Sequence, residues 1–117
     1  MARPVTPFLW LTFSAGGTLA ALLFTIHILI FGLGVPMGWI EAPSYDSLRA
    51  LVAHPLTRLY LLAFIALPLF HWAHRFRYTL YDGLQQKHLT ELIAVLCYGT
   101  ALAGAAAAAV TLWNFRP

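Results

Sequence analysis

The 117-residue chain is 61% hydrophobic, and only 9% of its residues are charged. Soluble domains carry about 25% charged residues, so this composition excludes an ordinary soluble domain and indicates an all-α integral membrane protein. The formal net charge of +3 comes from basic residues clustered at the ends of apolar runs, so they are interpreted as topology signals and nucleic acid is not expected as a partner.

Three runs nearly free of charge, residues 8–35, 59–73 with polar flanks, and 92–113, predict three transmembrane helices at roughly residues 8–35, 55–78 and 90–113. A helix needs about 20 apolar residues to cross a bilayer core of roughly 30 Å. A cleaved signal peptide is the alternative for the first run, but its apolar stretch far exceeds the usual length of about 7–15 residues, and only Arg3 precedes it. We therefore expect residues 1–117 to form a single membrane domain.

The connection between the first two spans, GVPMGWIEAPSYDSLRALVAHP, is expected to follow the outer interface, with a short amphipathic turn near residues 46–53. The side of the membrane opposite to this connection carries about one basic residue more than the side on which the connection lies. The positive-inside rule then predicts a cytoplasmic N-terminus, a cytoplasmic loop at roughly 77–89 and an external C-terminus. The basic residues assigned to the cytoplasmic side are Arg3, Arg75, Arg77 and Lys87.

The second span ends in an ionisable cluster, HWAHRFRY at residues 71–78. On a helix, one face carries His71, His74, Arg75 and Tyr78, which are spaced i, i+3, i+4 and i+7. Arg77 points elsewhere and is interpreted as an interfacial anchor. Charged groups at membrane depth are costly and usually face a partner, a cavity or a pathway.

Two interpretations of this face stay open on the residues alone. The first is an anchoring collar of basic and aromatic side chains at the membrane surface. The second is a pocket for a quinone, whose carbonyl oxygens need hydrogen-bond donors, whose ring needs apolar walls and whose reduction needs a titratable neighbour. Trp10 and Phe13, at the start of the first span, are expected at the same membrane level as this cluster.

Haem is the competing cofactor, because His27 and His71 both fall inside spans. With opposite chain directions they are offset by roughly 18 Å along the membrane normal, too far for one iron to be held by both. Pairing of one histidine with a partner subunit stays open. His27 is interpreted as hydrogen-bonded to a neighbouring helix.

Other classes of function have less support. The single cysteine, Cys97, excludes an iron–sulfur or zinc site built from this chain alone, so no metal site is predicted. A proton-coupled exporter needs a carboxylate within the membrane, whereas Glu91 falls in the first turn of the third helix. A redox-silent structural anchor remains an alternative.

Small residues recur four apart in the first and third spans, in the pairs Gly16/Ala20, Gly17/Ala21, Gly99/Ala103 and Gly104/Ala108. Membrane helices associate mainly through close packing of such residues. The third helix is therefore expected to pack against neighbours, and three helices alone suggest a partner membrane subunit.

Two stretches, PFLWLTFSAGG at 7–17 and HPLTRLYLLAFIALPLFHWAHRFRYTLYDGL at 54–84, resemble the D subunit of bacterial fumarate reductase, a haem-less three-helix membrane anchor. The resemblance covers nearly the full chain. It implies a non-catalytic, quinone-binding subunit in the bacterial cytoplasmic (inner) membrane, paired with a second membrane anchor, the C subunit. Together they would hold an iron–sulfur subunit and a flavoprotein subunit.

The resemblance further implies that electrons pass from menaquinol through the iron–sulfur clusters to flavin, where fumarate becomes succinate. The alternative is the anchor of a succinate:quinone oxidoreductase running in the opposite direction, with or without haem. Menaquinone would be shared with partner subunits, and no haem is expected in this chain.

Carried over by position, the resemblance assigns roles to five residues. Trp10 and Phe13 would form a wall of the quinone pocket, and Ser14 stands where family members often have glycine. His74 would act as proton relay or hydrogen-bond partner, and Arg75 as donor to the quinone. Further candidates for the pocket are His71 and Tyr78.

Overall fold

The computed structural model describes residues 6–116, and within them the chain is helical, with no strand. Three helices of this part are long and apolar enough to cross a membrane: Thr6–Gly34, Pro55–Gly83 and Lys87–Asn114. The predicted all-α, three-span class is therefore confirmed. Arg3, which contributes to the topology argument, lies outside the described residues.

The first helix is continuous but changes its hydrogen-bonding pattern along its length. α1 (Thr6–Leu19) and the short α2 (Thr25–His27) are α-helical, while Ala20–Phe24 and Ile28–Gly34 have the wider π pattern. The wider pattern persists at the end of the helix, where the Val35 amide donates to the Ile30 carbonyl at 2.9 Å.

A short helix, α3 (Tyr45–Ala53), lies within the first connection and confirms the amphipathic turn expected near 46–53. Ser44 is its N-cap, because its hydroxyl accepts a hydrogen bond from the Ser47 amide at 3.1 Å. The chain then leaves the helix at His54, whose imidazole Nδ1 accepts from the Leu56 amide at 3.2 Å and caps the next helix. Pro55 occupies the first turn of that helix, where its missing N–H costs nothing.

The second long helix extends further than expected. α4 (Pro55–Tyr78) runs on through a π turn, Thr79–Gly83, so the loop expected at roughly 77–89 is wrong in its extent. A 3₁₀ turn at Lys87–Leu89 then leads directly into α5 (Thr90–Asn114). Only residues 84–86 lie between the two long helices, which makes α4 and α5 a tight antiparallel hairpin.

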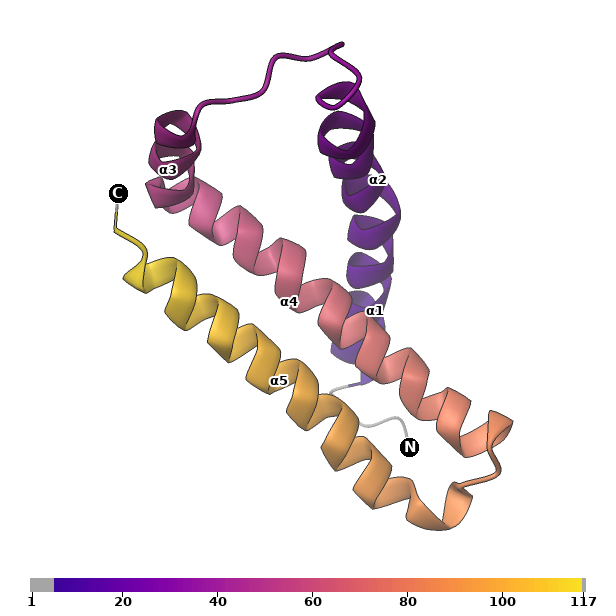
Figure 1. Cartoon of the computed structure of the whole chain (residues 1–117). Helices are drawn as coiled ribbons and strands as arrows, with labels where there is room; N and C mark the ends of the chain where they lie inside the picture. Colours follow the sequence, from indigo (N-terminus) through magenta and orange to yellow (C-terminus); the bar gives the residue numbers. More distant parts are fainter. Residues whose placement is uncertain (1–5, 117) are drawn as a thin grey trace.

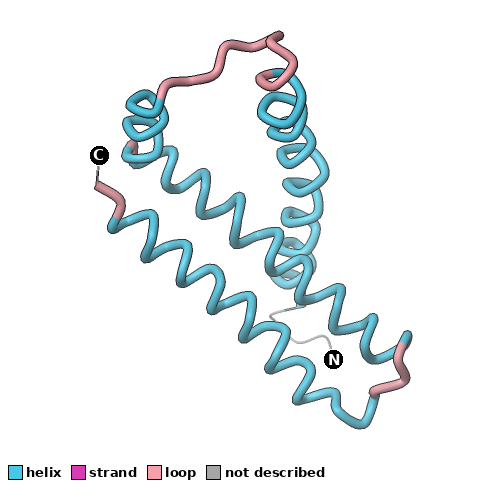
Figure 2. The backbone as a smooth tube through the Cα atoms, in the orientation of Figure 1, coloured by secondary structure: helices cyan, strands magenta, loops and turns pink. Residues whose placement is uncertain are grey.

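α4 is the central helix of the molecule (Figure 1). It packs along α5 on one side and crosses α1 on the other, while the first helix diverges from it toward the end that carries α3. Figure 2 shows the long connection that bridges this gap to α3. The C-terminal end of α5 lies beside α3, where Arg58 donates to the Phe115 carbonyl at 2.8 Å and Arg49 to the Arg116 carbonyl at 3.2 Å.

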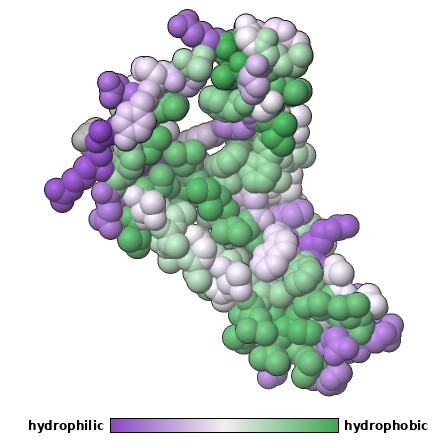
Figure 3. Space-filling view, in the orientation of Figure 1, coloured by the Kyte–Doolittle hydropathy of each residue, from purple (hydrophilic) through white to green (hydrophobic). Residues whose placement is uncertain are grey.

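Most large apolar side chains of the three helices are exposed in the isolated chain. Figure 3 shows this apolar surface along the helices, with hydrophilic residues gathered at the α3 end and at the turn between α4 and α5. In a membrane such a surface faces lipid or other apolar helices. The buried core is correspondingly small and lies mainly between α4 and α5; it comprises Ala73, Tyr81, Ile93, Cys97 and Ala101.

The crossing of α1 and α4 is closest at two glycines. A Cβ on Gly16 would collide with the Leu67 carbonyl oxygen and lie 2.8 Å from the His71 Cβ. A Cβ on Gly17 would lie 2.7 Å from the His71 ring. The backbones can approach this closely only because both positions lack a side chain, as in other small-residue helix contacts.

The expected small-residue contacts are thus present in part. Gly16 and Gly17 meet α4, and a Cβ on Gly104 would lie 2.8 Å from a Leu69 methyl group. Gly99 differs, because nothing lies within 4 Å of the position its Cβ would take. α5 therefore packs on α4 through one face and leaves another uncovered by this chain.

Substituting Gly16→Ala should destabilise the protein, because α1 and α4 must separate to admit the new methyl group. We expect a loss of about 1–3 kcal/mol, the usual range for overpacking, seen as a lower thermal-aggregation midpoint of the detergent-purified protein. Gly32→Ala is the matched control, since its Cβ would meet only an Ile28 methyl at an ordinary 3.5 Å. Equal midpoints for the two variants would contradict the crossing geometry.

Candidate functional site

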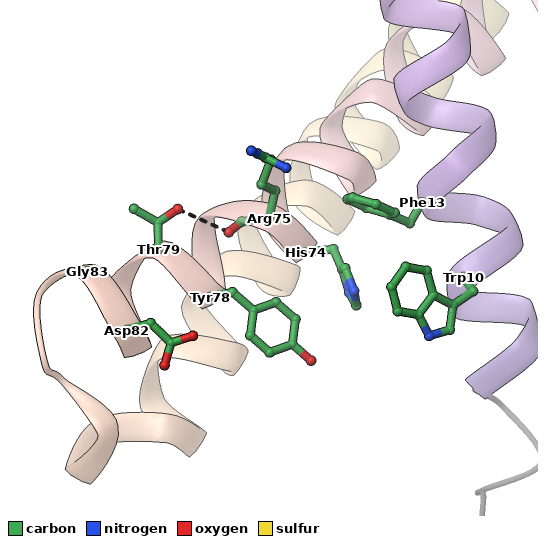
Figure 4. Close-up of a pocket in the computed structure, with 8 residues that line it drawn as sticks. All are labelled: Trp10, Phe13, His74, Arg75, Tyr78, Thr79, Asp82 and Gly83. Atoms are coloured by element: carbon green, nitrogen blue, oxygen red, sulfur yellow. Dashed lines mark hydrogen bonds between the residues drawn. The ribbon is translucent and has the colours of Figure 1, made fainter.

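A cavity of about 440 Å³ opens where the start of α1 faces the end of α4. Figure 4 shows its lining side chains, which come from α1, from α4 and from the π turn that extends α4. The volume falls within the roughly 300–1,000 Å³ typical of small-molecule sites. The lining residues are Trp10, Phe13, His74, Arg75, Tyr78, Thr79, Asp82 and Gly83.

Aromatic rings form the α1 side of this cavity. Trp10 and Phe13 meet edge to face, with ring centroids 5.9 Å apart. Both also contact His74 of α4, at centroid distances of 6.2 Å for Trp10 and 5.0 Å for Phe13. The expectation that these residues lie at the same membrane level as the His74 cluster is confirmed.

His74 is the one buried polar or charged residue of the part of the chain that the structure describes, at 8% exposure. Figure 4 shows its imidazole between Trp10 and Tyr78. Its Nδ1 lies 2.7 Å from the Tyr98 hydroxyl of α5, a hydrogen-bond distance. A buried imidazole needs such a partner, because an unpaired polar group in an apolar setting is costly.

Arg75 is exposed and extends away from Tyr78 and Asp82 (Figure 4). Its backbone carbonyl accepts a hydrogen bond from the Thr79 hydroxyl at 3.3 Å. Among residues 6–116 its guanidinium has no carboxylate within ion-pair distance. The side chain also lines a second hollow of about 300 Å³, formed with His71, Trp72, Phe76 and Thr79.

Asp82 brings an acidic group to the rim of the main cavity. It pairs with Lys87 across the turn at 3.4 Å, and both side chains are about 70% exposed. Exposed pairs of this kind contribute little to stability. Asp82 therefore lowers the net positive charge at the mouth of the cavity without neutralising Arg75.

His71 has a different environment from His74, although the two share a helix face. Its ring stacks on Phe13 at a centroid distance of 4.2 Å and an interplanar angle of 10°. Its Nδ1 donates to the Phe13 carbonyl at 2.8 Å, and the ring fills the space above Gly17. In this position His71 fastens α1 to α4 and does not line the main cavity.

Of the seven residues predicted for a pocket, the structure brings five to one cavity: Trp10, Phe13, His74, Arg75 and Tyr78. Ser14 is exposed on α1 and is not among the lining residues. Tyr78 contacts His74 edge to face, with centroids 5.4 Å apart.

Arg77, interpreted from the sequence as an interfacial anchor, packs against tyrosine rings of this chain. Its guanidinium lies over the rings of Tyr78, Tyr98 and Tyr81, at 4.5, 5.2 and 5.8 Å from their centroids. Its Nε is buried. Arg77 is thus a cation–π partner between α4 and α5. The hairpin places α5 against the side of α4 from which the Arg77 side chain projects.

Sequence reasoning missed Thr79, Asp82, Gly83 and Tyr98. The first three continue the spacing of His74, Arg75 and Tyr78 by one helical turn. The span predicted from the sequence ends at residue 78 and therefore excludes them. The sequence indicates a role for Tyr98 only weakly. It is a single phenol within an apolar span, and its hydroxyl requires a hydrogen-bond partner when buried.

At the α3 end of the molecule, His27 has the role expected for it. Its Nδ1 lies 2.6 Å from the Leu23 carbonyl, and its Nε2 lies 3.4 Å from the Tyr60 hydroxyl of α4. Hydrogen bonding to a neighbouring helix is therefore confirmed.

The cavity combines features suited to one kind of ligand. Its aromatic wall fits a flat ring, Arg75 offers fixed donors to oxygen atoms, and the His74 imidazole can accept or donate a hydrogen bond. These properties match a ring-shaped ligand that carries hydrogen-bonding oxygens.

Comparison with known proteins gives a consistent result. The family model that describes the D subunit of fumarate reductase matches residues 1–113. The fumarate reductase D subunit of Mycobacterium tuberculosis (strain ATCC 25618 / H37Rv) is 48% identical over 106 residues, covering 91% of this chain and 85% of that protein. The protein of the same name from Vibrio vulnificus (strain YJ016) is 33% identical over 115 residues, covering 97% of this chain and 89% of that protein.

Substituting His71→Leu should loosen the α1–α4 contact, because it removes the bond to the Phe13 carbonyl and the stacked ring. We expect a loss of about 1–2 kcal/mol, measured as a lower thermal-aggregation midpoint. His88→Gln, at an exposed position of the turn before α5, is the control and should leave the midpoint unchanged. A His71→Leu protein as stable as this control would contradict the fastening role.

Proposed function

The chain belongs to the family of fumarate reductase D subunits, and from this premise we propose that it forms one wall of a menaquinol site and helps to tether the catalytic subunits. Membership makes it a multi-pass membrane-anchor subunit of a fumarate reductase or succinate:quinone oxidoreductase complex. The proposed partners are a second membrane anchor (the C subunit), an iron–sulfur subunit and a flavoprotein subunit.

The observation that carries the quinone proposal is the meeting in one cavity of a buried histidine, two aromatic rings and an arginine that has no carboxylate partner among residues 6–116. A bound menaquinol supplies two electrons and two protons when it is oxidised. Trp10 and Phe13 would hold the ring against the α1 side. Arg75 would donate to a ring oxygen, and His74 would accept a proton from a hydroxyl group.

The remaining candidates have secondary places in this proposal. Tyr78 completes the wall beside His74, and His71 acts behind Phe13 by fixing the position of that ring. A direct contact of Ser14 with the ligand stays a prediction, since its side chain is outside the lining of the cavity. The cavity is open on one side, which a partner subunit would close.

The same residues would serve electron flow in either direction, because the proton acceptor of quinol oxidation is the proton donor of quinone reduction. We propose menaquinol oxidation coupled to fumarate reduction as the physiological direction, on the strength of the family. We also propose that this chain binds no haem. The His71 imidazole bonds to the Phe13 carbonyl and lies against Gly17. The His27 imidazole bonds to the Leu23 carbonyl and lies 3.4 Å from the Tyr60 hydroxyl, so each imidazole has a structural partner.

The proposed orientation places the cavity on the cytoplasmic side, next to the soluble subunits. Its support is that the turn with Lys87 lies at the cavity end of the molecule, whereas α3 and the end of α5 lie together at the other end (Figure 1).

Replacing Arg75 with leucine should lower quinol oxidation by the complex at least about tenfold, the effect of losing a charged hydrogen bond. Fumarate reduction with an artificial dye donor, which reaches the catalytic subunits directly, should keep its rate. Arg116→Leu, at the opposite end of the molecule, is the control for loss of an exposed arginine. Parallel loss of both activities in Arg75→Leu would point to an assembly role and contradict quinone binding.

Orientation can be measured by labelling single cysteines in a Cys97→Ser background with a membrane-impermeant maleimide. In intact cells, Ser47→Cys of α3 should react, and His88→Cys should react only after the membrane is permeabilised. The reverse pattern would place the cavity on the external side.

A further inference from the structure

We propose that the Tyr98 hydroxyl is the positioning group for His74, holding the imidazole in the orientation and tautomer that proton exchange with a quinone requires. This inference rests on the function proposed above and adds to it a residue of α5, which lines no part of the main cavity.

The contact between the two residues is short and sheltered. The Tyr98 hydroxyl lies 2.7 Å from Nδ1 of His74, which is 8% exposed. The rest of the imidazole is enclosed by Trp10, Phe13 and Tyr78. Tyr98 is therefore the polar partner of His74 on the side of α5, and Nε2 is the ring nitrogen left for a ligand.

A phenol suits this position because its oxygen can accept a hydrogen bond from Nδ1–H of both the neutral imidazole and the imidazolium. When the Tyr98 oxygen accepts from Nδ1–H, the neutral imidazole keeps a lone pair on Nε2 and can take a proton. In quinone reduction the imidazolium donates its Nε2 proton while Nδ1–H stays bonded to the Tyr98 oxygen, so the same orientation serves the reverse step. One partner thus supports His74 in either direction of electron flow.

The proton and electron balance is that of quinol oxidation. Two electrons pass to the iron–sulfur subunit, and of the two hydroxyl protons one passes to His74 and the other to water. His74 accepts its proton at Nε2, so that an O–H bond of the quinol breaks and an N–H bond forms, while the Tyr98 oxygen keeps the hydrogen bond that it accepts from Nδ1–H. His74 afterwards releases the proton from Nε2 to water.

The Tyr98 ring is held in place by its neighbours, as a positioning role requires. Phe70 lies 5.5 Å away between ring centroids, and the Arg77 guanidinium lies 5.2 Å from the centroid of the Tyr98 ring. Arg77 is itself held over Tyr78 and Tyr81. The hydroxyl therefore has little freedom to move away from His74.

The simpler alternative is that Tyr98 only satisfies a buried histidine. The two roles differ in what removal of the hydroxyl does. A purely structural bond affects stability, whereas a positioning bond changes the tautomer of His74 and the rate of quinol oxidation.

The test compares Tyr98→Phe with Tyr81→Phe in the complete complex. Tyr81 is a matched control, because it also lies under Arg77 but its hydroxyl donates to the Thr90 carbonyl at 2.8 Å and not to His74. His74→Gln identifies the His74 signals by their loss. The readouts are the nitrogen-15 NMR shifts of labelled histidine in lipid, binding of a naphthoquinone to the complex, and the rates with quinol and with dye.

We expect Tyr98→Phe to shift the His74 Nδ1 signal and to lower kcat with quinol by about fivefold to tenfold, the effect of one hydrogen bond. The dye-dependent rate should not change, and naphthoquinone affinity should change less than twofold. Tyr81→Phe should match the unmodified complex in all four measurements.

Two different results would overturn the inference. If Tyr98→Phe leaves the His74 signal or the quinol rate unchanged while His74→Gln lowers that rate, then Tyr98 does not position His74 and the proposed quinone site stands. If His74→Gln itself leaves quinol oxidation and naphthoquinone binding intact, the proposed function of the site fails, and the role of Tyr98 fails with it.

Discussion

The close approach of α1 to α4 at Gly16 and Gly17 is the contact on which the candidate site depends. Without side chains at these positions, the His71 ring lies flat against α1 and bonds to the Phe13 carbonyl. This fixes the rotation of α1, so that Phe13 and Trp10 face His74 one turn further along. In a membrane, where apolar burial drives helix association only weakly, such close packing and a polar contact between helices supply much of the specificity.

The polar residues of α4 face two neighbouring helices, α1 and α5, and have different roles on the two sides. On the side of α1, His74 and Arg75 border an open cavity, and Arg75 retains donors without a carboxylate partner among the described residues. On the side of α5, Arg77 is enclosed by aromatic rings and stabilises the hairpin. One helix can therefore carry two arginines near the same depth, one structural and one available to a ligand. The uncovered apolar surface of the three helices agrees with a subunit that works within a complex.

Much of this arrangement could be predicted from the sequence. Apolar length predicted the three spans, and helical spacing together with the family resemblance brought Trp10, Phe13, His74 and Arg75 together. Two features could not be obtained in this way. The π turn beyond Tyr78 depends on hydrogen bonding that no local residue signals, so Asp82 was assigned to a loop. The environments of Arg77 and Tyr98 depend on how α5 rotates against α4, which is decided by small contacts such as Gly104 with Leu69.

The proposed function requires that the basic imidazole–guanidinium edge of α4 face an enclosed redox ligand. A high-resolution electron cryomicroscopy map of the intact complex in lipid nanodiscs, prepared with a bound naphthoquinone, would observe this edge directly. We predict flat density between Trp10, Phe13 and His74, with an oxygen within hydrogen-bond distance of His74 or Arg75. Acyl-chain density alone around these two residues, with no cavity between this chain and its neighbour, would contradict the proposal and leave the subunit with tethering as its sole role.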